Sequence, residues 1–424
     1  MKKTVLLSLV LFYTIGAFAF EKVVSYSLFK TITKEEFQAT MKKRHLPKIL
    51  IAAHYTVDVY DVTYLSHWHD GSVIKASGLY YVPHNAKKAM PEIVYHHGTR
   101  MEKGRKEKLG GEESLCLGMA MDGYLVLQPD YIGLGYGDKF HLYQVASSEG
   151  QGSVDMLFAI RELNDSLKIK TNGMLFLTGY SEGGYSTLAT HKLIQEKYSD
   201  QLHVTASSAM SGAYDMAGAQ SGVMFKPYSR PHYLPYILNS YNEVYGFVHG
   251  DINSIYKTPY DTLIPHLFDG KHNINEVDRL LPGIPSQMLK DSFVNLFRTD
   301  PKFPFTVALQ ANNLYDWKPE APVQLCYCDS DEQVTCRNSF VAYDKMRSNG
   351  AQHITLRRAG VNFTHSRCAI IASLYTKMYF DTFRNGSKYG GKGSAGKRFV
   401  ASLAKYIVSK HKERSGNGEG RRRS

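Results

Sequence analysis

Short apolar runs alternate with longer helix-prone stretches along most of this chain. Apolar runs bounded by turn residues predict buried strands, and longer amphipathic stretches predict helices. Strands are predicted at residues 57–62, 72–82, 92–96, 124–128, 174–178, 204–210, 323–328 and 354–358. Helices are predicted at residues 111–121, 149–164, 184–198, 339–348 and 366–383. The first two strands flank a turn at Asp70-Gly71 and form a hairpin, and the later alternation predicts a mostly parallel, doubly wound α/β sheet.

The alternation stops between residues 218 and 314, where the chain is dense in Tyr, Phe, Pro and Met. Helical pieces are predicted there at 233–248 and 275–281. Such an insertion between core strands predicts a mostly helical cap over the carboxyl edge of the sheet, where α/β folds bind ligands. We therefore divide the chain into a signal peptide (1–19), a first core part (20–214), a cap (215–315), a second core part (316–383) and a tail (384–424).

The first residues have the pattern of an export signal. Lys2 and Lys3 precede an apolar stretch at residues 5–18, and Ala17-Phe18-Ala19 is a small-x-small cleavage site. Because the stretch is short for a membrane span, it predicts a cleaved signal peptide rather than an uncleaved anchor. The mature protein is therefore expected to be secreted or periplasmic.

Basic charge is concentrated at the other end of the chain. Residues 384–424 carry 12 of the 51 Lys and Arg residues and 2 of the 39 Asp and Glu residues. Without this tail and the lysines of the signal peptide the chain is neutral, so the net charge of +12 does not indicate nucleic-acid binding. The tail is predicted to be flexible, with a helix-prone stretch at 399–408. The alternative is a weak anchor to anionic lipid or polysaccharide, with at most peripheral membrane contact.

A pattern typical of a nucleophile elbow, Gly179-Tyr180-Ser181-Glu182-Gly183, stands between a predicted strand and its helix. In such an elbow a serine occupies the apex of a strained turn, with its hydroxyl clear of the sheet. Glycines flank it because neighbouring Cβ atoms would not fit. The context favours Ser181 as the nucleophile of a serine hydrolase, with Gly179 and Gly183 as its supporting residues.

A serine nucleophile needs a base that takes its proton and an acid that orients the base. In this fold the acid follows a later strand and the base comes last. Asp331 lies a few residues past the strand at 323–328, with the apolar Val334 three positions on, and is the preferred acid. Asp329 is the alternative, and either carboxylate could instead cap the following helix.

His365 is the predicted base. It follows the last predicted strand and a short loop, and it stands immediately before the helix at 366–383. Loops in this position can hold an imidazole over a serine on another loop. His353 precedes its strand and would lie at the opposite edge of the sheet.

An oxyanion hole needs two backbone donors aimed at the developing negative charge. One is predicted to be the amide of Glu182, directly after the nucleophile. The other is expected in the loop after the strand at 92–96, which reads His97-Gly98-Thr99. Gly98 lets the backbone turn closely, and the Thr99 amide is the predicted donor.

The chain has five cysteines, Cys116, Cys326, Cys328, Cys336 and Cys368, an odd number that leaves at least one thiol over. Four lie near the predicted acid and base loops, so a bridge among them could brace these loops, and the pairing stays open. The Cys-x-Cys pair has no matching ligand pair at zinc spacing, and the adjacent histidines of the oxyanion loop lack a third ligand, so no metal site is predicted. The chemistry requires no cofactor.

Five stretches together resemble the secretory-lipase branch of the α/β-hydrolase superfamily, in a bacterial exported form. They are Tyr95-His96-His97-Gly98-Thr99, Pro129-Asp130-Tyr131-Ile132-Gly133-Leu134-Gly135, Gly179-Tyr180-Ser181-Glu182-Gly183-Gly184, Gly212-Ala213-Tyr214-Asp215 and His365-Ser366-Arg367-Cys368-Ala369. The resemblance implies Ser181 as nucleophile, Asp331 as acid and His365 as base. It also implies a helical lid at about 215–315 and carboxylic-ester substrates.

We therefore expect an exported serine hydrolase that cleaves small-molecule, lipid or polysaccharide esters through an acyl-enzyme. Two alternatives stay open: a serine peptidase of the prolyl-oligopeptidase type without its propeller, and a non-catalytic binding module on the same fold. The oligomeric state also stays open. Apolar cap residues are expected to line an acyl or aryl pocket, namely Met224, Phe225, Tyr228, Tyr233, Tyr236 and Phe268.

Overall fold

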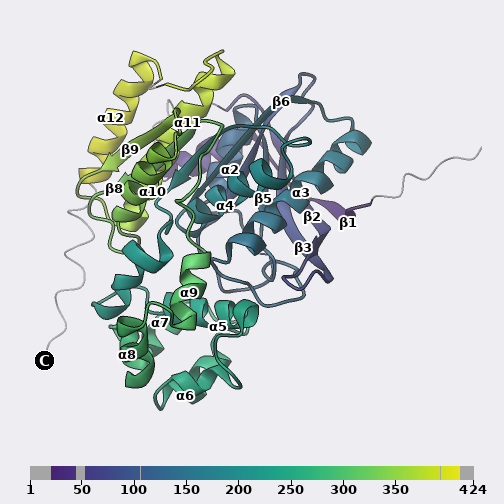
Figure 1. Ribbon diagram of the computed structural model, residues 1–424. Coiled ribbons are helices and arrows are strands. Elements are labelled where there is room, and N and C mark those ends of the chain that lie inside the picture. Colours follow the sequence, from purple (N-terminus) through teal and green to yellow (C-terminus); the bar gives the residue numbers. More distant parts are fainter. Residues whose placement is uncertain (1–20, 44–52, 106, 392, 411–424) are drawn as a thin grey trace, which may run out of the picture.

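The computed structural model describes residues 21–43, 53–105, 107–391 and 393–410. The predicted signal peptide at 1–19 and the tail beyond residue 410 lie outside these residues. A central sheet with helices on both faces occupies the upper part of Figure 1, and a helical lobe lies beneath it.

Nine strands form one sheet in the order β1-β2-β3-β5-β4-β6-β7-β8-β9. Their bounds are β1 Val23–Ile32, β2 Val57–His67, β3 Val73–Pro83, β4 Met90–His96, β5 Leu125–Pro129, β6 Thr171–Tyr180, β7 Val204–Met210, β8 Val323–Cys328 and β9 Ile354–Gly360. The first three strands pair antiparallel with their neighbours, and the strands from β5 to β9 along the sheet run parallel. The predicted doubly wound α/β sheet is confirmed, and β7 and β8 have the predicted bounds.

β1 is not among the predicted strands, because its apolar side chains do not mark a buried face. Val24, Tyr26 and Leu28 are exposed, and only Val23 is buried. This edge strand is held by its ladder with β2 and by Glu162, which accepts hydrogen bonds from the backbone amides of Lys22 (3.0 Å) and Val23 (3.3 Å). Edge strands therefore give a weaker sequence signal than central strands.

Alternate residues of the central strands enter two hydrophobic cores on opposite faces of the sheet. In β6, Leu175 and Leu177 pack with α3 (Ala146–Leu167) and α4 (Glu182–Lys197), whereas Phe176 packs with α2 (Glu113–Met121) and α11 (His365–Arg384). Successive side chains of a strand point to opposite faces, so each face is covered by its own pair of helices. α1 (Lys34–Lys43) joins the second core, and α10 (Arg337–Ser348) packs beside β8 and β9.

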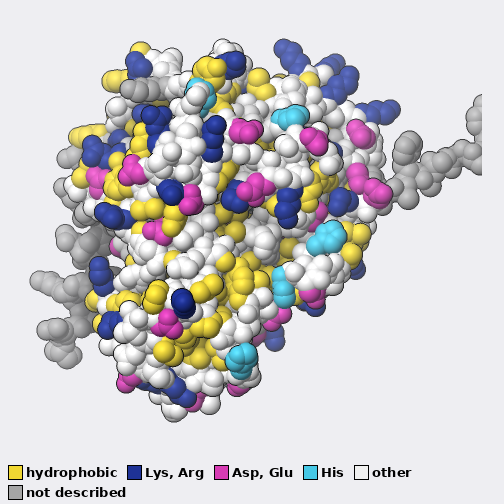
Figure 2. Space-filling view, viewed as in Figure 1, with side chains coloured by type: hydrophobic (Ala, Val, Ile, Leu, Met, Phe, Trp, Pro, Cys, Tyr) yellow, Lys and Arg dark blue, Asp and Glu magenta, His cyan; other side chains and the backbone are white. Residues whose placement is uncertain are grey.

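The segment between β7 and β8 forms the helical lobe in the lower part of Figure 1. Its elements are η2 Met216–Gln220, η3 Ser221–Phe225, α5 Tyr233–Tyr245, η4 Ile252–Ile255, α6 Tyr260–Leu263, η5 Ile264–His266, α7 Ile274–Leu280, η6 Pro285–Met288, α8 Asp291–Thr299 and α9 Pro304–Ala311. Hydrophobic side chains gather over this lobe on the face shown in Figure 2. The insertion is helical, as expected, and we call residues 215–315 the cap; its bounds as a separate unit stay a prediction.

The tail is not a free appendage over the part that the structure describes. α12 (Ala395–Lys410) packs on α11, with Ala401 and Ala404 buried in the contact. Lys397 Nζ lies 2.6 Å from Asp381 Oδ2 of α11. Small side chains on one face of α12 let the two helices approach closely. The prediction of a flexible tail is therefore wrong for residues 395–410.

The start of α4 lies against the end of β4 without room for a methyl group. A Cβ added to Gly183 would lie 2.0 Å from the His96 carbonyl oxygen, and a Cβ added to Gly179 would lie 2.4 Å from the same atom. Real atoms do not approach this closely, so either side chain would push the helix away from the strand. This contact gives a steric reason for glycine on both sides of Ser181.

Replacing Gly183 with alanine should therefore destabilise the fold. We expect Gly183→Ala to lower the free energy of unfolding by about 3 kcal/mol or more, because the clash is with backbone that cannot rotate away. Gly222→Ala is the matched control, since an added Cβ there meets nothing within 4 Å. Chemical denaturation of the two variants measures the difference, and equal midpoints would contradict the steric argument.

Candidate active site

Ser181 occupies the turn between β6 and α4. Its backbone has φ 63° and ψ −120°, a strained conformation for a residue with a side chain, as a nucleophile elbow requires. Ser181 N donates a hydrogen bond to the Met210 carbonyl of β7 (2.9 Å), and Gly184 N donates to the Ser181 carbonyl (2.9 Å). The residue is 6% exposed, so its hydroxyl is shielded from bulk solvent.

Asp331 and His365 form a hydrogen-bonded pair. Asp331 lies in the loop after β8, and His365 is the first residue of α11 rather than the last residue before it. His365 Nδ1 is 2.8 Å from each carboxylate oxygen of Asp331. Asp331 Oδ1 also accepts hydrogen bonds from the amides of Gln333 (3.1 Å) and Val334 (2.9 Å). These donors orient the carboxylate, which in turn keeps the proton on Nδ1 and leaves Nε2 as the basic nitrogen.

The alternative acid, Asp329, is directed elsewhere. Its carboxylate lies 3.3 Å from an Arg358 guanidinium nitrogen at a partly exposed position. Its backbone amide donates to the Gly360 carbonyl (3.0 Å). Of the two candidate acids, the structure brings only Asp331 to His365.

Tyr180 links the base to the elbow. Its ring centroid is 4.8 Å from that of His365, and its hydroxyl donates to the His365 carbonyl. His365 therefore lies beside the residue that precedes Ser181. Among the hydrogen bonds of the described residues, none joins Ser181 Oγ to His365. Such catalytic contacts are often long in ligand-free enzymes and shorten when substrate binds.

A disulfide ties the acid loop to the base helix. Cys328 ends β8, three residues before Asp331, and is bonded to Cys368, three residues after His365. The bridge therefore connects the loop that carries Asp331 with the start of α11, which carries His365. It is one of the cysteine pairings that the sequence left open. The cysteines at 116, 326 and 336 are free thiols.

Two backbone amides, those of Thr99 and Glu182, meet a first requirement of an oxyanion hole, because they are free to donate. Within the described chain, neither the Thr99 amide nor the Glu182 amide donates a hydrogen bond, so both are available to a ligand. The loop after β4, which carries Thr99, is held by Glu112. The Glu112 carboxylate accepts hydrogen bonds from the Gly98 amide (2.9 Å) and the Tyr95 hydroxyl (2.9 Å). This anchoring fixes the loop that carries Thr99, and Glu112 has no sequence motif that would reveal its role.

The histidines of this loop are structural. His96 bonds to the Thr178 carbonyl (3.0 Å) and the Ser153 hydroxyl (3.1 Å), and His97 bonds to the Gly98 carbonyl (2.7 Å). Burial lowers the pKa of His96 to about 4 and the pKa of His97 well below its ordinary value. Both rings are therefore neutral and engaged in hydrogen bonds with their surroundings.

A cavity of about 50 Å³ lies between Ser181 and the cap. Its lining is mostly apolar and includes Met224, Tyr228 and Tyr233 from the predicted set, together with Leu234, Ile237, Phe305 and Leu309. Phe225, Tyr236 and Phe268 do not line it, which corrects the prediction for these three. Tyr236 instead stacks on Tyr143 (4.6 Å between centroids), and Phe268 packs against Tyr236 (5.2 Å).

Comparisons with known proteins concern the family and the fold of this chain. Residues 108–265 match the sequence profile of the secretory lipase family. A protein from Legionella pneumophila assigned as a hydrolase has a similar structure: its identity is 28%, its TM-score is 0.81, and the match covers 87% of this chain and 99% of that one. The chain has the α/β-hydrolase fold, and its residues 108–265 resemble the secretory lipase family. No curated protein sequence matches it.

Two further solved structures share the fold of this secretory-lipase-like hydrolase. The rice cell wall degrading esterase LipA from Xanthomonas oryzae has 23% identity and a TM-score of 0.76, over 87% of this chain and 98% of that one. Candida antarctica lipase A in its closed state has 15% identity and a TM-score of 0.63, over 93% of this chain and 92% of that one. These two structures show a shared fold, and the secretory lipase match supports the predicted class of carboxylic ester hydrolase.

The Pro-Asp-Tyr stretch has a structural role in this secretory-lipase-like hydrolase. Arg105 makes two 2.7 Å hydrogen bonds to Asp130 and two more, at 3.0 and 3.1 Å, to Asp61. Burial opposes ionisation of Asp130, but Arg105 outweighs it and lowers the pKa of this carboxyl group. Tyr131 then donates from its hydroxyl to the His97 carbonyl (2.6 Å). The stretch therefore connects the loop after β5 with the oxyanion loop.

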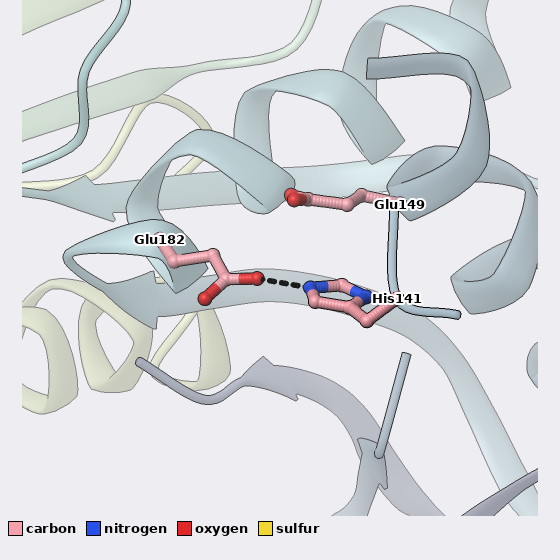
Figure 3. Close-up of side chains that lie close together, drawn as sticks. All are labelled: His141, Glu149 and Glu182. Atoms are coloured by element: carbon pink, nitrogen blue, oxygen red, sulfur yellow. Dashed lines mark hydrogen bonds and ion pairs between the residues drawn. The ribbon is translucent and has the colours of Figure 1, made fainter. Parts of the chain in front are cut away.

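One group of side chains in this hydrolase is not predicted as a group by the sequence. His141, Glu149 and Glu182 are buried together behind the elbow, although they come from three different segments (Figure 3). Among the described residues this is the group of His, Cys, Asp and Glu side chains whose atoms lie close enough to hold a metal ion. His141 and Glu149 are eight residues apart and Glu182 follows 33 residues later, which is no ligand spacing, so no motif marks the three as a group.

Of the helices that the structure describes in this hydrolase, none has the length and apolar composition needed to cross a membrane.

The disulfide should stabilise the secretory-lipase-like hydrolase and hold its base helix. We expect the double variant Cys328→Ala/Cys368→Ala to lose about 4 kcal/mol of unfolding free energy, since the bridge closes a loop across 40 residues. We also expect a larger loss of activity than the loss of folded protein explains. Thermal denaturation and an esterase assay measure the two effects. Cys336→Ala, which removes a free and partly exposed thiol, is the control and should behave like the wild type.

Proposed function

We propose that this protein is an exported serine hydrolase that cleaves carboxylic esters through an acyl-enzyme. Ser181 acts as the nucleophile, His365 as the base and Asp331 as the acid. The proposal is supported chiefly by the 2.8 Å contacts between Asp331 and His365 Nδ1, made beside a strained serine elbow. Export rests on the pattern of residues 1–19 and on the secretory lipase match.

In the first step, Ser181 Oγ attacks the ester carbonyl carbon while His365 Nε2 takes the hydroxyl proton. The carbonyl oxygen becomes an oxyanion, which the Thr99 and Glu182 amides stabilise. Collapse of this intermediate breaks the bond to the alcohol oxygen, and the proton on His365 passes to the departing alcohol. Water then attacks the acyl-enzyme by the same route and releases the acid. Asp331 stays ionised and stabilises the imidazolium formed in each step.

The cavity supports an acyl-binding role for the cap. Its mostly apolar wall suits the hydrocarbon part of an ester, while Ser181 and Gln144 add polar groups. Its volume of about 50 Å³ is far below the several hundred Å³ of pockets that hold drug-sized ligands. A short acyl group therefore fits the closed arrangement, whereas a long chain requires the cap to move.

Serine and acid variants test the proposed chemistry. A fluorophosphonate probe should label the wild type and fail to label Ser181→Ala, because the probe forms a bond to an activated serine. Asp331→Asn should lower kcat by roughly 10³ to 10⁴, since the amide NH2 that replaces one carboxylate oxygen donates to Nδ1 and favours the wrong tautomer. Asp329→Asn is the matched control and should keep the wild-type rate.

These measurements also separate the alternatives. Absence of labelling in folded wild-type protein would contradict the proposal and favour a binding module. Faster cleavage of aminoacyl anilides than of p-nitrophenyl esters would favour a peptidase.

The size of the cavity predicts the acyl preference. We expect kcat/KM to be at least about tenfold higher for p-nitrophenyl butyrate than for the palmitate, because the longer chain must displace the cap. Met224→Ala enlarges the cavity and should shift the preference towards longer acyl chains. Phe268→Ala is the control, since this cap residue does not line the cavity. Equal rates across the series in the wild type would contradict a closed, short pocket.

A further inference from the structure

The side chain of Glu182, the residue after Ser181, is directed at His141 (Figure 3). Glu182 Oε1 lies 2.7 Å from His141 Nε2, and Glu149 of α3 lies close to both. All three residues are almost completely buried. The contact is too short to lack a proton, so either the imidazole or the carboxyl group donates.

The other ring nitrogen of His141 helps to decide which group carries the proton in this contact. His141 Nδ1 is 3.0 Å from the Ile132 carbonyl oxygen, which can only accept a hydrogen bond. Nδ1 therefore carries a proton. If the ring is neutral, Nε2 has a lone pair and must accept, and the proton in the short contact then belongs to Glu182.

The two carboxyl groups of the cluster differ in their donors. Glu149 accepts from the Gln144 amide (2.6 Å) through Oε1 and from the Ser186 hydroxyl through Oε2. In contrast, Glu182 Oε2 has no partner among the described residues. The Thr99 hydroxyl shares a 3.1 Å hydrogen bond with Tyr143 in which either group can donate, and its side chain also acts to lower the pKa of Glu182, against the larger effect of burial. Burying a carboxylate oxygen without a hydrogen bond costs much free energy. Burying the carbonyl oxygen of a neutral carboxylic acid in the same position costs far less.

We propose that Glu182 is a neutral carboxylic acid that donates its proton to His141 Nε2, and that this bond positions the Glu182 amide for the oxyanion. Glu149 carries the negative charge of the cluster, because both of its oxygens receive donors. Glu182 is a positioning residue in this role, since its side chain does not touch the reacting atoms. The functional half of the inference rests on the proposed function, whereas the protonation state does not.

The surroundings favour the neutral pair over an imidazolium–carboxylate pair. Burial raises the pKa of Glu182 well above its ordinary value, and burial lowers the pKa of His141. Burial also raises the pKa of Glu149, and the neighbouring Glu182 adds to the effect, so the two acids are not both ionised. The titratable and charged groups that face Glu182 are His141, Glu149, Glu112, Arg100, Tyr131, Tyr143, Tyr233 and Tyr236.

The cluster is less suited to a metal ion. Two donors of a tetrahedral zinc ion lie about 3.3 Å apart, since each is about 2 Å from the metal. The 2.7 Å contact between Glu182 and His141 is shorter and has the length of a hydrogen bond. Both oxygens of Glu149 are also engaged by donors that a cation would displace.

The bond would couple two loops that must hold still during catalysis. His141 is fixed to the loop after β5 through Ile132, and its ring stacks on Tyr131 (5.4 Å between centroids). Glu182 is the first residue of α4, so tethering its side chain also fixes the orientation of its backbone amide. Loss of one oxyanion donor typically costs on the order of a hundredfold or more in kcat, so even partial misalignment should be measurable.

Three variants test the inference kinetically. Glu182→Gln keeps an N–H donor for His141 Nε2 and should retain kcat within about threefold. Glu182→Leu has a similar volume but no donor, and should lower kcat at least about tenfold with little change in KM. Glu196→Gln, an exposed position on the same helix, is the control for the substitution itself. Equal loss in the Gln and Leu variants, or no loss in either, would overturn the proposal.

The pH profile gives a second readout. The raised pKa of Glu182 means that the neutral clamp is present below this pKa and is lost as the pH rises through it. A decline of kcat at alkaline pH should therefore move to higher pH in Glu182→Gln, whose amide does not ionise. An alkaline limit that is identical in both proteins would contradict the inference.

Protonation can be observed without any activity. In ¹⁵N NMR of the histidine-labelled enzyme, with His141→Gln for assignment, His141 should show a protonated Nδ1 and an unprotonated, hydrogen-bonded Nε2. An imidazolium signal, or stoichiometric metal by elemental analysis, would overturn the assignment. Fluorophosphonate labelling of the same sample tests the proposed function separately, so a failure of one can be told from a failure of the other.

Discussion

The contact between the first turn of α4 and the last residue of β4 determines where the nucleophile stands. Two glycines allow the His96 carbonyl to approach the helix, and the chain between them has to turn sharply. The positive φ of Ser181 is the local cost of this approach. Because β4, β6 and β7 are buried central strands, packing on both faces of the sheet maintains the strain. The elbow is therefore a consequence of how closely a helix can lie on a sheet.

Much of the core follows from the sequence, for identifiable reasons. β7 and β8 are apolar and bounded by turn residues, so their pattern gives their bounds. The order of Ser181, Asp331 and His365 follows from the topology of a doubly wound sheet, which brings the carboxyl ends of distant strands to one edge. Choosing Asp331 over Asp329 depends on side-chain direction, which the pattern does not contain, and the structure resolves it through the contact with His365.

Other features depend on contacts between distant segments, which a linear pattern does not record. β1 exposes Val24, Tyr26 and Leu28 to solvent, so its apolar positions do not alternate with a clear inward face. Ala401 and Ala404 of α12 have little hydrophobic signal individually and matter only because α11 lies against them. His141, Glu149 and Glu182 meet through three segments, and only the folded chain shows that their donors and acceptors must be shared. Cap aromatics such as Tyr236 stack on one another, and the pattern alone does not separate them from those that line the cavity.

The order of the catalytic residues along the chain has a consequence for biosynthesis. Asp331 and His365 follow Ser181 by 150 and 184 residues, and they lie in the loop after β8 and at the start of α11, which follows β9. A ribosome therefore releases the serine and the helical insertion long before it releases the pair that activates the serine. Until the last part of the polypeptide has emerged, Ser181 lacks both side chains that are proposed to activate it, so under the proposed function the nascent chain is inactive.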